Sequence, residues 1–125
     1  MQSEHDIVVT VRTEYLSEQS VPEDDRYVFA YHITMTNCGT VAAKLLSRHW
    51  VITDGNEKVQ EVKGEGVVGQ FPYLTPGESY DYSSGSVLET VVGIMQGSYR
   101  FLAEDGTEFD APIAPFTLAV PNQVH

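Results

Sequence analysis

The sequence predicts an all-β domain in which about seven or more mostly antiparallel strands form a sandwich of two sheets. Apolar side chains recur at every second position over most of the 125 residues, and turn signals such as Asp54-Gly55 and Asp105-Gly106 separate these segments. No stretch of ten or more residues shows the 3.6-residue apolar period of a helix. Without an internal repeat or a composition break, we expect residues 1–125 to form a single domain.

The first two strands follow from simple alternation. Residues 7–15 carry apolar side chains at odd positions and polar ones between them, which predicts a half-buried strand. Residues 17–25 contain a proline and three consecutive acids, and they predict a solvated loop. Residues 26–37 again alternate, so we expect their odd positions to face the core, and Asn37-Cys38-Gly39 ends this strand with a turn signal.

The third strand, residues 44–53, is more apolar on both faces and carries the only tryptophan, Trp50. We expect Trp50 to be buried, in phase with Leu46 and Ile52. A hairpin turn at residues 54–56 then predicts a returning strand at residues 58–62.

The next part of the sequence has weaker signals. Residues 74–77 form a proline-glycine turn signal, and residues 79–83 predict a short strand with two tyrosines in phase. We expect residues 85–97 to form a long connection with Gly93 as a flexible point.

The C-terminal hairpin has the strongest signal. Residues 98–103 and 107–120 alternate on either side of Asp105-Gly106, which predicts two antiparallel strands. The apolar positions of the last strand change from odd to even at Ala114-Pro115. A bulge is expected there, because the phase change needs one extra residue and proline removes a ladder hydrogen bond.

The segment Lys63-Gly64-Glu65-Gly66-Val67-Val68-Gly69 contains a G-x-G-x-x-G pattern. In dinucleotide-binding folds this pattern opens a helix whose N–H groups face the pyrophosphate. Pro72 follows three residues after the last glycine, so no helix can open here and we place the motif in a loop between strands. The glycines then permit positive φ or a close approach of the sheets. A backbone nest for phosphate, assisted by Lys63, is the alternative, although Glu65 would repel an anion.

Arg48 and His49 precede the tryptophan and point to opposite faces of a strand. An arginine on the core side needs carboxylate or carbonyl partners, which favours a structural clamp. The alternative is an anion or peptide site built from Arg48, or from His49 on the other face, together with the glycine loop. The candidate ligand-binding residues are therefore Arg48, His49, Lys63, Gly64, Glu65, Gly66 and Gly69.

Charge excludes two classes of partner. The net charge is -11, from 18 acidic against 7 basic residues, and no basic stripe is present, so we expect no binding to nucleic acid or anionic membrane. Cys38 is the only cysteine and cannot form an internal disulfide. No signal-peptide core and no apolar run near 18 residues is visible, so we expect a soluble, cytoplasmic protein.

Catalytic and metal signatures are missing. The four histidines show no i, i+2 or i, i+4 pairing, and the acids at residues 23–25 lack the spacing of a calcium loop, so we expect no metal and no cofactor. Ser84 and Ser86 flank Gly85 without a G-x-S-x-G elbow. We therefore predict no catalytic residues and no enzyme activity.

Several segments carry a family resemblance. The run Leu74-x-Pro76-Gly77-x-x-Tyr80 resembles the sheet-crossing turn of fibronectin type III domains, and the tryptophan stands where immunoglobulin-like sandwiches keep one. Residues 45–56, 59–69, 74–85 and 93–99 together resemble the ApaG family, also called ApaG/CorD, whose members are small bacterial proteins or domains appended to larger eukaryotic ones. The resemblance implies an immunoglobulin-like or fibronectin type III-like sandwich, a poorly defined molecular role, and an association by name with cobalt and magnesium tolerance.

Two functions follow as hypotheses. The first is a non-catalytic ApaG-domain binding module that holds a protein partner through loops or strand edges. The second is a small-ligand protein that binds a pyrophosphate-containing molecule, such as a dinucleotide polyphosphate, at residues 63–69 with help from Arg48 or His49, linked to cobalt and magnesium tolerance.

Overall fold

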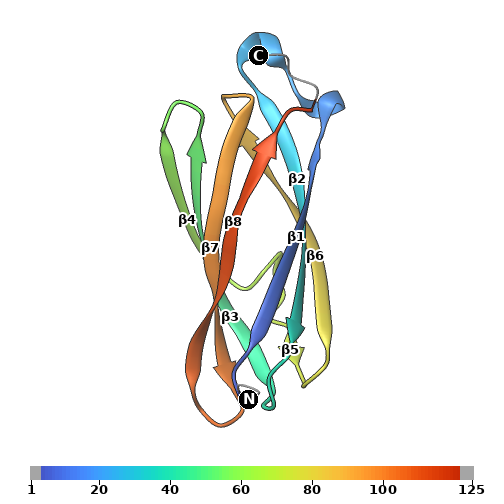
Figure 1. The fold of residues 1–125 in the computed structure, drawn as a ribbon, viewed down its shortest axis with the longest axis vertical. Coiled ribbons are helices and arrows are strands. Elements are labelled where there is room, and N and C mark those ends of the chain that lie inside the picture. The colour runs from blue at the N-terminus through green and yellow to red at the C-terminus, as the bar shows by residue number, and fades with distance from the viewer. Residues whose placement is uncertain (1–3, 122–125) are drawn as a thin grey trace.

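A computed structural model describes residues 4–121 as two antiparallel sheets packed face to face (Figure 1). The first sheet has the order β1-β2-β6, with β1 at Ile7–Tyr15, β2 at Tyr27–Asn37 and β6 at Ser79–Leu88. The second has the order β4-β3-β7-β8, with β3 at Ala43–Asp54, β4 at Val59–Glu65, β7 at Val92–Ala103 and β8 at Glu108–Ala119, while β5, Tyr73–Leu74, pairs with β3. The described residues contain no α-helix, and two 3₁₀ turns, Ser17–Gln19 and Pro22–Asp24, lie in the predicted loop. The prediction of an all-β sandwich is confirmed.

The core lies between the sheets, where the inward residues of both layers meet. In β2 the odd positions from Phe29 to Met35 are buried, as the alternation predicts. Trp50 is 2% exposed, and its ring meets those of Tyr31, Tyr99 and Phe116 edge-on at centroid distances of 5.4, 6.1 and 5.9 Å. Its predicted burial is confirmed, and aromatic pairs of this geometry add to the free energy gained by burying their area.

The predicted phase of β3 is correct for Ile52, which is buried like Trp50, and wrong for Leu46. The register with β7 shifts between Leu45 and Ser47, so Leu46 is an extra residue in β3. Leu45 is fully buried and Leu46 only partly, which means that Leu46 does not share a face with Trp50. An extra residue of this kind reverses the inward parity of every position that follows.

The predicted bulge in the last strand is confirmed. Met95 pairs with Phe116, whereas Gly97 pairs with Ile113, so β8 contains one residue more than β7 between these pairs. The extra residue falls at Ala114-Pro115. β8 also lies beside β1 at one edge of the sandwich (Figure 1).

The predicted long connection at residues 85–97 is wrong. β6 continues to Leu88 and β7 begins at Val92, so only three residues connect them. Gly93 lies inside β7, buried between Asp54 and Leu118 of the neighbouring strands, and is not a flexible point. The inward positions of β6 between Tyr82 and Leu88 are Ser84 and Ser86, and these two serines interrupt the apolar alternation on which the prediction depended.

Replacing Gly97 tests how closely β3 and β7 approach. A Cβ at this position would overlap the carbonyl oxygen of His49 across the strand pair. We expect Gly97→Ala to lower the free energy of unfolding by about 2–3 kcal/mol in urea titrations, because the added methyl group can be accommodated only if the backbones of the two strands move apart. Gly85→Ala is the control, since its Cβ would lie 3.3 Å from its nearest neighbour, the Phe29 carbonyl oxygen. Equal stability of the two variants would contradict this account.

Candidate functional site

Arg48 connects β3 to the end of β4. It lies on the inward face of β3, and its Nη1 donates to the carbonyl oxygens of Glu65 at 3.1 Å and Gly66 at 2.9 Å. The guanidinium lies against Gly64, where an added Cβ would come within 2.7 Å of Cζ. These contacts match the clamp interpretation, with carbonyl groups as the partners.

The glycine motif is divided between a strand and a turn. Lys63, Gly64 and Glu65 belong to β4, so the predicted loop begins only at Gly66. Val67 and Gln70 close a tight turn by bonding to each other in both directions, each N to O distance being 2.9 Å.

Positive φ explains the glycines of this turn. The turn's central residues, Val68 and Gly69, have φ values of 49° and 76°, the sign that the primed turns of β-hairpins require. Gly66 has a φ of 63°. No helix starts at residues 64–71, as predicted.

Most amide groups of this turn donate to carbonyl oxygens of the protein itself. The amide of Gly66 bonds to the Leu46 carbonyl at 3.0 Å, and those of Val67 and Gln70 close the turn. A phosphate nest needs successive N–H groups that face the ligand. The amides of Val68 and Gly69 are the ones in this turn without a backbone partner among the described residues. The pyrophosphate hypothesis stays a prediction, and it depends on these two groups.

The other two candidate cations lie on the outer face of the sheet. Nε2 of His49 is 3.2 Å from Oε2 of Glu61, and Nζ of Lys63 is 3.6 Å from Oε1 of the same carboxylate. The pKa of Glu61 is lowered by these contacts, first by that with His49. The candidate residues therefore do not form one site: Arg48 faces inward, whereas His49, Lys63 and the exposed Glu65 face outward.

Cross-strand pairing creates a second cluster that the sequence analysis missed. On the outer face of the three-stranded sheet, Nδ1 of His32 lies 2.6 Å from Oγ of Ser83 and its Nε2 lies 3.3 Å from Oε1 of Glu14. The order serine, histidine, acid is that of a nucleophile with its base. Ser83 and Glu14 lie on the two edge strands, β6 and β1, on either side of His32 on the central strand β2.

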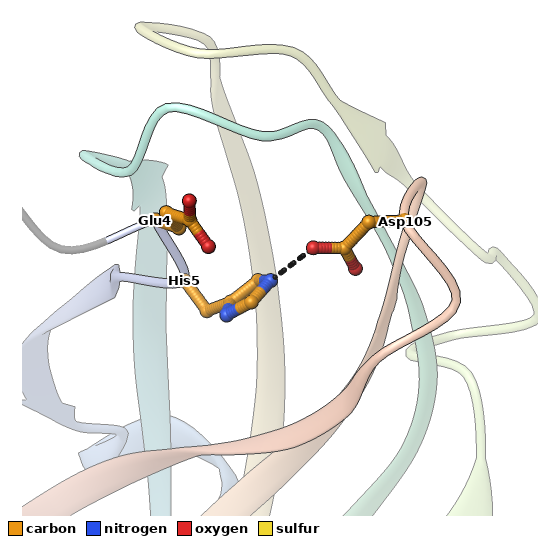
Figure 2. Close-up of side chains that lie close together, drawn as sticks. All are labelled: Glu4, His5 and Asp105. Atoms are coloured by element: carbon orange, nitrogen blue, oxygen red, sulfur yellow. Dashed lines mark hydrogen bonds and ion pairs between the residues drawn. The ribbon is translucent and has the colours of Figure 1, made fainter.

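A third cluster joins the N-terminal segment to the β7–β8 hairpin (Figure 2). Glu4, His5 and Asp105 each place a potential ligand atom within 4.8 Å of the other two, and His5 Nε2 is 2.9 Å from Asp105 Oδ2. The pKa of Asp105 is lowered, first by the amide of Thr107 and then by His5. One imidazole and two carboxylates suit a divalent cation, but exposed acids around a histidine are common without one. Local spacing could not reveal this cluster, because Asp105 lies 100 residues from His5 in the sequence.

A family model described as the ApaG domain matches residues 17–103 of this protein. The chain belongs to the ApaG family. It is 62% identical over 121 residues to Protein ApaG of Thiobacillus denitrificans, an alignment that covers 97% of this sequence and 95% of that relative. It is 63% identical over 119 residues to Protein ApaG of Azoarcus sp., with 95% and 94% covered.

The solved structures agree with this family assignment. A protein from Bordetella pertussis described as ApaA superposes with a TM-score of 0.95 at 49% identity, covering 98% of this protein and 100% of that one. The resemblance found in the sequence is thus confirmed. No helix in residues 4–121 has the length and apolar character to cross a membrane.

Removing the clamp tests its role in holding the glycine turn. Arg48→Ala leaves the Glu65 and Gly66 carbonyls without their charged donor, a loss of about 2 kcal/mol in the local opening free energy. We therefore expect amide exchange at Gly66, Val67 and Gln70 to accelerate by about 30-fold.

Arg100→Ala is the matched control for the clamp, because Arg100 pairs with Glu108 and Asp110 on the exposed face of the same sheet. We expect no effect of this variant on exchange in the turn. Unchanged protection in Arg48→Ala would show that the turn holds its shape without the clamp.

Tyr82 of β6 and Tyr99 of β7 join the two sheets by a hydrogen bond between their hydroxyl groups. Burial is the main cause that raises the pKa of Tyr82 to about 12, and burial also raises the pKa of Tyr99. Both phenols therefore stay protonated in the folded protein at a pH where the unfolded state ionises.

This difference predicts a loss of stability in alkali. Above about pH 10 the unfolded state binds fewer tyrosine protons than the folded one, so the contribution of these two phenols to stability is constant below about pH 10 and is lost as the pH rises towards 12. We expect Tyr82 to account for about 2 kcal/mol of this fall, measured by urea unfolding between about pH 9 and 11.5. The double variant Tyr82→Phe, Tyr99→Phe should show a flatter profile, and a profile as steep as that of the unsubstituted protein would refute the assignment.

Proposed function

We propose that this ApaG-family protein is a non-catalytic module that binds a partner protein through apolar side chains exposed beside the glycine turn. Val68 is 65%, Phe71 44% and Tyr73 52% exposed, in a segment whose backbone is bonded internally. Exposed aromatic residues on a rigid support are typical of the anchors of protein interfaces. This combination is the observation that carries the proposal.

The anchor residues gather around Lys44. Nζ of Lys44 lies 5.9 Å from the centroid of the Phe71 ring, and Lys44 pairs with Tyr73 of β5 on one side and with Leu102 of β7 on the other. Leu102 is itself 38% exposed. We call Phe71, Tyr73 and Leu102 the outer patch. Its members sit on, or directly beside, paired strands, so a partner would bind them with little loss of conformational entropy.

The charges around the outer patch indicate which residue types a complementary partner segment would carry. Tyr73 donates from its hydroxyl to Oε2 of Glu104 at 3.3 Å, and its pKa is raised by desolvation first and then by the nearby Glu104 and Glu78. The protein as a whole has a net charge of -11. A partner segment with apolar residues flanked by lysine or arginine is therefore the complementary one.

Two positions of similar exposure allow a controlled test. A photo-crosslinking residue at position 71 should capture a specific protein in cells of the source organism, whereas the same residue at position 94 should not. Ile94 is the control because it is 46% exposed on the same sheet, where it pairs with Thr53 and Thr117 away from the outer patch.

The purified partner then provides the quantitative step. Phe71→Ala or Tyr73→Ala should weaken its affinity at least about tenfold, and Ile94→Ala should leave it unchanged. The free energies of unfolding should stay similar, since all three side chains are exposed. Equal crosslinking at positions 71 and 94, or unchanged affinity in both aromatic variants, would count against the outer patch.

A further inference from the structure

A cavity of about 320 Å³ opens between the sheets on the side where β4 and β6 form the edges. Its volume lies within the range of small-molecule sites, which begins at about 300 Å³. Trp50, Ile52 and Met95 supply apolar wall, and Gln60, Ser84 and Ser86 supply polar groups. We call this space the lateral cavity. The inward serines of β6, Ser84 and Ser86, line it, which explains why the apolar alternation of that strand is interrupted there.

The charge of the lateral cavity differs from that of the rest of the protein. Arg48 is its one charged lining residue, and no aspartate or glutamate among the described residues lines it, although the sequence has 18 acids against 7 basic residues. Nη1 of Arg48 is occupied by the two carbonyls of the clamp, whereas Nε and Nη2 have no hydrogen-bond partner among residues 4–121. The clamp thus fixes a guanidinium whose remaining donors suit a carboxylate.

Trp50 provides a second, independent observation. Its ring lines the lateral cavity, and its Nε1 is buried without a hydrogen-bond partner among the described residues. The neighbouring rings of Tyr31, Tyr99 and Phe116 offer only weak π acceptors for an N–H group. A buried N–H group without an acceptor is unfavourable in a folded protein. Residues 48 and 50 share one face of β3, so both side chains lie on the cavity side of the sheet.

We propose that the lateral cavity binds a small organic acid with one carboxylate and an apolar body. The carboxylate would bind to Arg48, and the apolar body would lie against Trp50, Ile52 and Met95. The volume corresponds to about ten water-sized groups, which fits a branched or aromatic acid of about six to eight carbon atoms. A single cation in a protein of net charge -11 suits a monoanion better than a pyrophosphate.

The only tryptophan gives the experiment a single reporter. The indole N–H resonance of Trp50 is followed by NMR, together with tryptophan emission, while 4-methylpentanoate or phenylacetate is titrated against the corresponding primary amide. We expect a saturable shift with the acids and at least about tenfold weaker binding of the amides, because the amides lack the charge that Arg48 recognises.

Three variants separate binding from folding. Arg48→Met should weaken binding at least about tenfold, and Ser84→Phe should abolish it by filling the lateral cavity without touching the clamp. His49→Ala, the neighbour on the outer face, should leave binding unchanged. No indole shift with any carboxylate up to about 10 mM, equal binding of acid and amide, or unchanged binding in both Arg48→Met and Ser84→Phe would overturn the proposal.

Two further ligands define the class. If N-acetylglycyl-leucine, a mimic of the carboxyl end of a polypeptide, binds and the free acids do not, the assignment to a free acid is wrong. If pyrophosphate, with or without magnesium, moves the indole resonance more strongly than the acids do, the assignment to a monocarboxylate is wrong. Binding of pyrophosphate at the glycine turn would instead shift the amides of Val68 and Gly69 and leave the acid affinity of the lateral cavity unchanged.

Discussion

One extra residue in β3 sets which side chains enter the space between the sheets. Before the bulge at Leu46 the inward residue is Leu45, and after it the inward residues are Arg48 and Trp50. With regular alternation from Leu45, His49 would occupy the core and the arginine would face water. The burial of the tryptophan, the clamp on β4 and the cation of the lateral cavity all depend on this irregularity.

Arg48 contacts both the glycine turn, which leads to the outer patch, and the lateral cavity. Its bonds to the carbonyls of Glu65 and Gly66 hold the start of the glycine turn, and the segment that follows carries Phe71 on the outside. The same side chain lines the lateral cavity. A guanidinium bonded to two backbone carbonyls keeps its positive charge but is held in one conformation. This preorganisation favours a rigid outer patch, and it also favours a defined anion site.

The sequence predicted those parts of the fold that local alternation specifies. The strand at residues 26–37, the hairpin at Asp105-Gly106 and the bulge at Ala114-Pro115 each leave a clear pattern. The bulge in β3 leaves none, because residues 45 and 46 are both leucine and either could face inward. The C-terminal half of β6 was not predicted, because its inward residues Ser84 and Ser86 line a cavity and are polar. A strand that lines a polar cavity lacks the apolar alternation by which strands are recognised in a sequence.

The candidate site was predictable only in part, because strand pairing decides which residues meet. Strand alternation separates Arg48 from His49, but the position of Glu61 beside His49 follows from the register of β3 with β4. The glycine spacing has three unrelated causes. Gly64 leaves room for a guanidinium, Gly66 has positive φ against the carbonyl of Gln70, and Gly69 is the second central residue of a tight turn. In a phosphate-binding fingerprint the same glycine spacing precedes a helix, whose N-terminal N–H groups bind the phosphate. In this protein the glycines lie on a strand that ends in a turn, so their spacing does not indicate a phosphate site of that kind.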